Sequence, residues 1–213
     1  MIVVGIASIP SRALQLKKTV ESLLPQVDKI NLSLNGYREI PKIFKHDKVE
    51  IELTDGTDEQ KFRKVEGDIY LSCDDDLIYP INYVEFIKHA LENHDIITFH
   101  GRNFQSLPIS SYYKSKSSRY RCLDKVAHDI YVQFGGTGCA AFMPEKFMLT
   151  LKDFPHKYMA DIQFAIAAKK ARKKIVCLAH EAGWIKYQEV GNTIFDRFKN
   201  EDFEQTALVN KYF

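Results

Sequence analysis

The stretch DIYLSCDDDLIYP, residues 68–80, decides how this sequence folds. Its first six residues are mostly apolar and favour extended structure, which predicts a buried strand over 68–73. Three aspartates follow directly, and Pro80 then opens a segment with helical periodicity. Two unit charges about 4 Å apart repel by roughly 4 kcal/mol at an effective dielectric of about 20, so adjacent carboxylates need a compensating partner.

Short apolar runs alternate with helical patterns on both sides of this stretch. We predict strands over 2–7, 29–34, 49–53, 68–73 and 95–100, with helical segments between them. This alternation predicts an α/β fold with a mostly parallel, doubly wound central sheet and flanking helices. Ligands of such sheets bind outside the carboxyl ends of the strands, where the aspartates lie.

The second part of the chain is less regular. Residues 103–122 are rich in Ser, Tyr, Lys and Arg and predict a mobile loop that could act as a lid. We predict two strand pieces around a glycine turn over 130–143, a helix over about 158–171 and a buried strand over 174–179. The tail after Trp184 is polar. With 213 residues and 45% hydrophobic content, the chain is long enough for one sizeable domain.

Composition excludes several classes of function. The net charge is only +2, and the basic clusters at 119–121 and 169–174 fit a polar loop and a helix end, so we expect no nucleic-acid partner. The apolar start is too short to span a membrane. The cysteines lack the CxxC spacing of zinc sites, and a disulfide framework is not expected: Cys73, Cys122, Cys139 and Cys177. Cys73, Cys139 and Cys177 lie in apolar runs and predict reduced core thiols, which fits a cytoplasmic protein.

The aspartates themselves predict a metal site. Alternate residues of an extended strand face the same way, so Asp74 and Asp76 would converge and Asp75 would turn away. Paired carboxylates suit Mn²⁺ or Mg²⁺, which share their coordination with substrate phosphates. The alternative is a solvated acidic turn that caps the following helix.

A nucleotide-binding βα half that ends in DDD, followed by GGTG at 135–138 and a helix bearing Asp161, resembles the GT-A glycosyltransferases. DDD matches the DXD motif of that superfamily. The resemblance runs from Val3 to about Trp184 and is nearest to small nucleotide-diphosphate-sugar transferases of bacteria and large viruses, including algal viruses. It implies a nucleotide-binding half over about 1–100 and an acceptor half over about 101–213.

The same resemblance implies a UDP-sugar donor, a glycan or other hydroxyl acceptor, and Mn²⁺ or Mg²⁺. For a viral protein the compartment would be the host cytoplasm, and the chain could be one module of a longer polypeptide. The donor-binding residues implied in the first half are Ala7, Ser8, Ile9, Arg12, Asp55, Lys61, Asp74 and Asp75. Turn chemistry is the alternative for Asp55, and a solvated helix face for Arg12 and Lys61.

The resemblance also implies metal ligands and a catalytic base. Asp76, Asp74 and His180 would hold the metal ion, with Glu181 as a competing ligand and a surface or core histidine as the alternative for His180. Asp161 would be the general base that activates the acceptor hydroxyl. Its alternative role is to complement a helix dipole.

Gly136 and Thr137 would line the pocket for the donor sugar and the acceptor, although a simple hairpin turn explains GGTG equally well. The implied reaction is a direct displacement that moves a hexose from the UDP-sugar to the acceptor. A retaining route stays open.

Two other functions also stay open. A sugar-1-phosphate nucleotidyltransferase combines a related architecture with metal and nucleotide, but its GxGxRxxP opening is missing from GIASIPSR at 5–12. A non-catalytic module that binds a nucleotide or glycan would need the same pocket without turnover.

Overall fold

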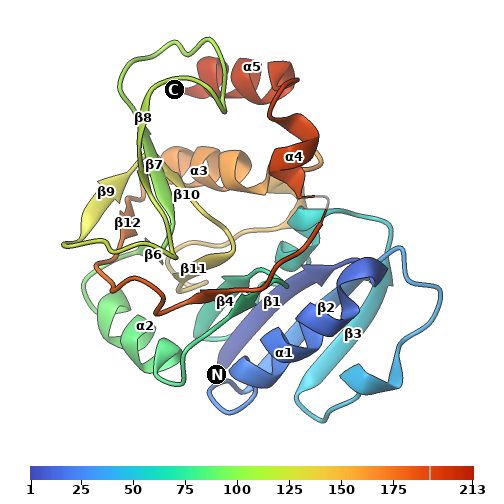
Figure 1. Ribbon diagram of the computed structural model, residues 1–213. Coiled ribbons are helices and arrows are strands. Elements are labelled where there is room, and N and C mark those ends of the chain that lie inside the picture. Colours follow the sequence, from blue (N-terminus) through green and yellow to red (C-terminus); the bar gives the residue numbers. More distant parts are fainter. Residues whose placement is uncertain (192) are drawn as a thin grey trace.

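An eight-stranded sheet forms the centre of the computed structural model, which describes residues 1–191 and 193–213 (Figure 1). Its strands, in spatial order, are β3 (Val49–Thr54), β2 (Lys29–Asn35), β1 (Ile2–Ser8), β4 (Ile69–Cys73), β11 (Cys139–Phe142), β6 (Ile96–Thr98), β12 (Ile175–Cys177) and β9 (Ile130–Val132). Two small sheets accompany it: β10 (Phe134–Gly135), β7 (Gly101–Phe104) and β8 (Ser117–Tyr120) form one, and β13 (Lys186–Tyr187) and β5 (Leu77–Ile78) form the other.

The central sheet is mixed rather than mostly parallel along its whole width. Strands β3, β2, β1 and β4 pair in parallel, as predicted. Strand β11 runs antiparallel between β4 and β6, and β9 runs antiparallel to β12. Parallel neighbours need a crossover connection of a dozen or more residues. Strands β9, β10 and β11 follow one another within 130–142 without a helix, so a sheet of parallel strands cannot form there.

Helices cover both faces of the sheet. The helices are α1 (Ala13–Leu23), α2 (Tyr83–Leu91), α3 (Ala160–Lys170), α4 (Ile194–Phe198) and α5 (Phe203–Tyr212), and the 3-10 turns are η1 (Pro10–Arg12), η2 (Lys42–Phe44), η3 (Asp58–Phe62) and η4 (Leu151–Asp153). One core cluster joins the sheet to Leu16 of α1 and Ile87 of α2. A second joins it to Phe62 of η3, Phe164 of α3 and Val209 of α5. The mixed α/β class is therefore clear.

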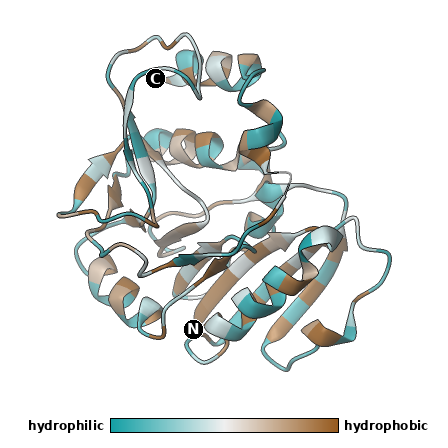
Figure 2. Ribbon diagram, in the orientation of Figure 1, coloured by the Kyte–Doolittle hydropathy of each residue, from teal (hydrophilic) through white to brown (hydrophobic). Residues whose placement is uncertain are grey.

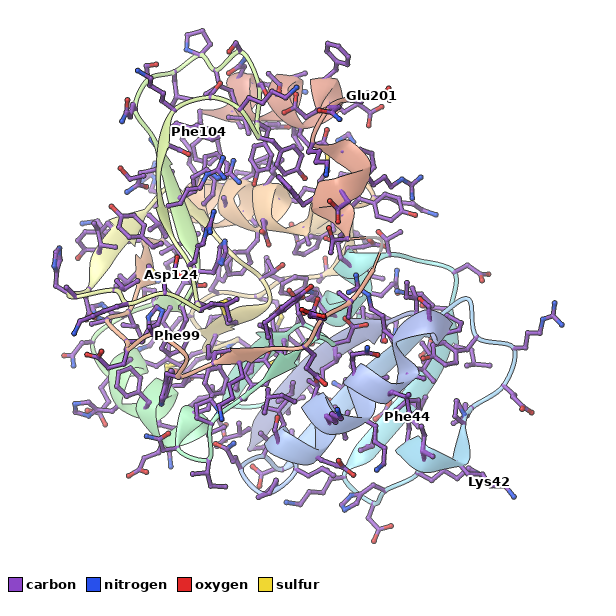
Figure 3. All side chains as sticks on the ribbon, in the orientation of Figure 1. Lys42, Phe44, Phe99, Phe104, Asp124 and Glu201 are labelled. Atoms are coloured by element: carbon purple, nitrogen blue, oxygen red, sulfur yellow. The ribbon has the colours of Figure 1, made fainter. Side chains whose placement is uncertain are left out.

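Hydrophobic residues concentrate in the central strands, while the helices alternate between apolar and polar faces (Figure 2). The predicted apolar face of α2 is confirmed, since Tyr83, Val84, Ile87 and Leu91 are all buried. Burial of each large apolar side chain in such a stripe stabilises the fold by about 1.5–3 kcal/mol. On the turn η2, Phe44 is buried and Lys42 extends away from the body of the protein (Figure 3).

The prediction of one mobile loop over 103–122 is wrong, because β7 and β8 pair within 101–120. The helical segment predicted before β4 is the short 3-10 turn η3, in which Glu59, Lys61 and Phe62 are buried. The polar tail after Trp184 is structured, since β13 pairs with β5 and α5 packs on α3. Among the described residues, no helix is long and apolar enough to cross a membrane.

Candidate functional site

A cavity of about 1010 Å³ lies where β1 and β4 end. The lower part of the molecule in Figure 1 contributes the ends of these strands and η3, and the upper part contributes the start of α3, the β7–β8 hairpin and α4. The parallel strands bring their carboxyl ends to one edge, as expected for a ligand site in an open α/β sheet. This volume is at the upper end of the range for small-molecule sites in proteins.

The three aspartates lie in a turn rather than in the strand. Strand β4 ends at Cys73, and Asp74, Asp75 and Asp76 all line the cavity. The prediction that Asp75 turns away is wrong, because the alternation of an extended strand does not continue through a turn. Asp75 is buried, and its carboxylate accepts hydrogen bonds from Ser8 Oγ at 2.6 Å and Arg12 Nη1 at 2.9 Å.

Basic side chains compensate much of the repulsion among the three aspartates. The ammonium group of Lys61 pairs with Asp74, and Arg12 reaches Asp75 and, at 3.5 Å, Asp76. Lys61 is only 3% exposed, so neither it nor Arg12 is a solvated surface cation. Burial opposes the charged form of Lys61, but the carboxylates of Asp74 and Asp58 outweigh it and raise its pKa.

Asp76 retains the least compensated charge of the three. Burial and the neighbouring charges of Asp74 and Asp75 raise its pKa to about 7, although Arg12 and Lys61 oppose that shift. A cation that binds beside Asp76 would stabilise the charged form of its carboxylate. The second oxygen of Asp74 receives no hydrogen bond from the described residues and lies over Gly138.

These residues fit a divalent cation whose coordination a substrate completes. Among the described residues, no group of three or more His, Cys, Asp or Glu side chains converges to hold a metal ion. Among the described residues, only the carboxylates of Asp76 and Asp74 would therefore serve as ligands to the cation. Mg²⁺ and similar hard ions are commonly held by one or two carboxylates together with phosphate oxygens and water.

The structure does not bring His180 to the aspartates. Its ring nitrogens lie 2.7 Å from the carbonyl oxygen of Leu178 and 3.2 Å from that of Arg121, and the ring packs edge-on against Phe99. The chain leaves β12 to form a bridge between His180 and Val126, which holds the imidazole away from the cavity lining. Trp184 also packs on Phe99, with 5.0 Å between ring centroids.

Asp161 lies in the first turn of α3 and lines the same cavity as the aspartate turn. One of its oxygens accepts hydrogen bonds from both the backbone nitrogen and the hydroxyl of Thr137, each at 2.7 Å. Thr137 lines the cavity as well. Gly136 does not, but it allows His100 to pack closely, since a Cβ at Gly136 would lie 2.8 Å from the His100 side chain.

Ala7, Ser8, Ile9 and Arg12 all line the cavity, but Asp55 does not and is exposed. Asp58, three residues further on, takes the place that sequence reasoning gave to Asp55. Its carboxylate accepts a hydrogen bond from the backbone nitrogen of Ala160 at 3.1 Å. Burial raises the pKa of Asp58 to about 6, even though Lys61 opposes the shift. Its position at the start of η3 is the signal that could have identified it.

Sequence reasoning also missed the wall opposite the strand ends. The β7–β8 hairpin places Arg102, Arg119 and Arg121 on the cavity, and α4 adds Phe195 and Arg197. Arg197 lies over the ring of Tyr158, 4.5 Å from its centroid. The basic run at 119–121 was visible in the sequence, but its place on a hairpin was not.

No protein-family model matches this chain, and no curated protein matches it. Among solved structures, the chain is similar to the crystal structure of A197 from STIV. The two are 15% identical, the match covers 89% of this chain and 84% of that chain, and the TM-score is 0.42. The fold and the site together define a mixed α/β protein whose cavity, at the ends of its parallel strands, is lined by both aspartates and arginines.

Proposed function

We propose that this chain is a metal-dependent glycosyltransferase of the GT-A class that moves a hexose from a UDP-sugar to the hydroxyl group of a glycan or similar acceptor. One observation carries the proposal. A cation-attracting carboxylate turn at the end of β4 and an oriented carboxylate on α3, Asp161, line one cavity. A metal-assisted displacement needs both kinds of carboxylate around the same substrate.

The donor would lie along the ends of β1 and β4. Ser8 and Ile9 supply the wall beneath the nucleotide, and Asp76 with Asp74 would hold Mn²⁺ or Mg²⁺ against the diphosphate. When bound, the cation would neutralise the charge that develops on the leaving diphosphate. Arg12 and Lys61 hold the aspartate turn in place through their ion pairs, so the carboxylates are preorganised.

Asp161 would act on the acceptor. Its carboxylate takes the proton of the acceptor hydroxyl while the acceptor oxygen forms a bond to the anomeric carbon of the donor sugar. The bond between that carbon and the phosphate oxygen breaks, and UDP leaves with the bonding electrons. Attack opposite the leaving group inverts the anomeric configuration. The β7–β8 hairpin and α4 enclose this side of the cavity and limit the water that would hydrolyse the donor.

A transfer assay with matched aspartate variants tests the proposal. A panel of UDP-sugars is incubated with Mn²⁺ and a mixture of glycan acceptors, and both UDP release and glycosylated product are measured. Asp76→Asn should abolish the metal-dependent reaction, and Asp161→Asn should keep donor binding and lose transfer by about 10²-fold or more. Asp124→Asn, at an exposed position outside the cavity, is the control and should react normally.

Two outcomes would contradict the proposal. Release of pyrophosphate from a sugar phosphate and a nucleoside triphosphate would identify a nucleotidyltransferase instead. Binding of UDP-sugar and Mn²⁺ without turnover for any acceptor or water would identify a non-catalytic binding module.

A further inference from the structure

Three arginines lie in or directly after the β7–β8 hairpin. Arg102 of β7 and Arg119 of β8 are direct cross-strand partners. Arg121 is the first residue after β8. All three line the large cavity. Like charges directly opposite each other destabilise a sheet. Arg119 and Arg121 are exposed, so water screens part of this repulsion, and an anion bound between the arginines would relieve the rest.

No carboxylate of the described residues relieves the repulsion, since none forms an ion pair with Arg102, Arg119 or Arg121. Neutral groups hold two of the guanidinium groups in place. Arg102 donates to the carbonyl oxygen of Tyr112 and lies 4.3 Å from the centroid of its ring. Arg119 donates to the carbonyl oxygen of Tyr113 at 2.6 Å.

The neighbouring charges also affect Arg119. Burial together with the charges of Arg102 and Arg121 lowers the pKa of its guanidinium group, and no carboxylate opposes them. The basic residues at the other end of the cavity differ. Arg12 and Lys61 are each paired with aspartates of the acidic turn. The cavity thus has one end where cations are already matched and another where they are not.

We infer that Arg102, Arg119 and Arg121 form an oxyanion site that binds a phosphate or carboxylate group of the ligand that fills the cavity. Each guanidinium group carries five N–H donors, and the contacts with Tyr112 and Tyr113 use only some of them. The planar fork of arginine matches both kinds of oxyanion. The site is separate from the aspartate turn, where the proposed metal ion would bind.

Two groups of the proposed substrates carry a phosphate or carboxylate that this site would bind. One is the diphosphate of a nucleotide-sugar, and the other is a phosphate or carboxylate on the acceptor. The choice between them rests on the proposed function, but the oxyanion site does not. Asp161 lines the same cavity as both the aspartate turn and the arginines.

Binding of inorganic phosphate tests the site directly. Its dissociation constant is measured by isothermal titration calorimetry at low ionic strength, without metal, for the full chain and for Arg119→Gln and Arg121→Gln. Each variant should bind phosphate about tenfold more weakly, the usual loss for one hydrogen-bonded charged contact. Arg38→Gln makes the same charge change at an exposed position outside the cavity and is the control.

Arg121 has an exposed side chain, so its replacement should leave the fold intact, and thermal melts verify this. Equal phosphate binding by the wild type and both cavity variants, or no phosphate binding at all, would overturn the inference. Neither result depends on turnover. Failure of the transferase proposal, seen as absent transfer with normal phosphate binding, is therefore a separate outcome.

A second set of titrations identifies the source of the oxyanion. UDP with Mn²⁺ is compared with methyl glucuronide and its neutral analogue, methyl glucoside. If Arg121→Gln weakens the binding of UDP by the same factor as the binding of phosphate, the oxyanion site holds the diphosphate of the donor. If Arg121→Gln weakens only the binding of methyl glucuronide, and leaves that of methyl glucoside unchanged, the oxyanion site holds an anionic group of the acceptor.

Discussion

Asp161 and Thr137 are joined by two hydrogen bonds that end on the same carboxylate oxygen, one from the backbone nitrogen and one from the hydroxyl, each 2.7 Å long. This contact links the GGTG segment before β11 to the first turn of α3. It fixes the rotation of the carboxylate and leaves its other oxygen without a hydrogen bond from the described residues. In the proposed reaction, that second oxygen would accept the proton of the acceptor hydroxyl.

Replacing Thr137 by valine should slow transfer while donor binding persists. Valine has nearly the same shape and keeps the backbone hydrogen bond, but it removes the hydroxyl that donates to Asp161. Loss of a hydrogen bond to a charged group should lower kcat/KM by about tenfold. Thr137→Ser should restore the rate, and a wild-type kcat/KM for the valine variant would exclude this role.

Replacing Lys61 by methionine should destabilise the fold strongly. Methionine fills similar space but removes the buried ammonium group that faces Asp74 and Asp58. Loss of one partner from a buried ion pair typically costs about 3–5 kcal/mol, and the partial exposure of Asp74 puts the expected loss near 3 kcal/mol. Urea unfolding gives the value. Lys64→Met, a half-exposed lysine in surface ion pairs, should lose less than about 1 kcal/mol. Equal losses would show that Lys61 is not a buried counter-ion.

Local sequence patterns predicted the strands and helices that depend on local periodicity. The runs that became β1 and β4 are short and mostly apolar, and those that became β2 and β3 alternate between apolar and polar residues. The buried face of α2 follows the helical repeat. The same patterns located the cavity edge, because the carboxyl ends of parallel strands meet there. The aspartate turn and Asp161 were therefore within reach of sequence reasoning.

Features set by distant packing were not predictable. Lys61 is buried because η3 packs against β1, and Asp75 reaches Arg12 across more than sixty residues of sequence. The antiparallel insertion of β11 depends on its pairing with both β4 and β6. His180 follows a strand end like the aspartates do, but its bridge to Val126 directs the ring elsewhere. No single-sequence pattern encodes these partners.

Replacing Gly138 by alanine should weaken metal and donor binding more than it weakens the fold. A Cβ at this position would lie 2.0 Å from one carboxylate oxygen of Asp74, so that side chain must move. We expect at least about tenfold weaker binding of Mn²⁺ with UDP, the equivalent of one lost charged contact. Gly191→Ala is the matched control, because its Cβ would meet open space. Titration calorimetry gives both values, and unchanged affinity for Gly138→Ala would remove Asp74 from the site.

The buried carboxyl group of Asp58 should make stability fall as the pH rises. Burial raises its pKa from an ordinary value of 3.8 to about 6, so the unfolded chain releases this proton before the folded chain does. The folded state therefore binds more protons between these values, and the resulting penalty is absent below about pH 4 and complete above about pH 6. Asp58→Asn has no charge to lose and can still accept the hydrogen bond from Ala160. Relative to the wild type, it should gain on the order of 2 kcal/mol between pH 4.5 and 7 in urea unfolding experiments. A difference that stays constant with pH would show that Asp58 ionises as freely in the folded chain as in the unfolded one.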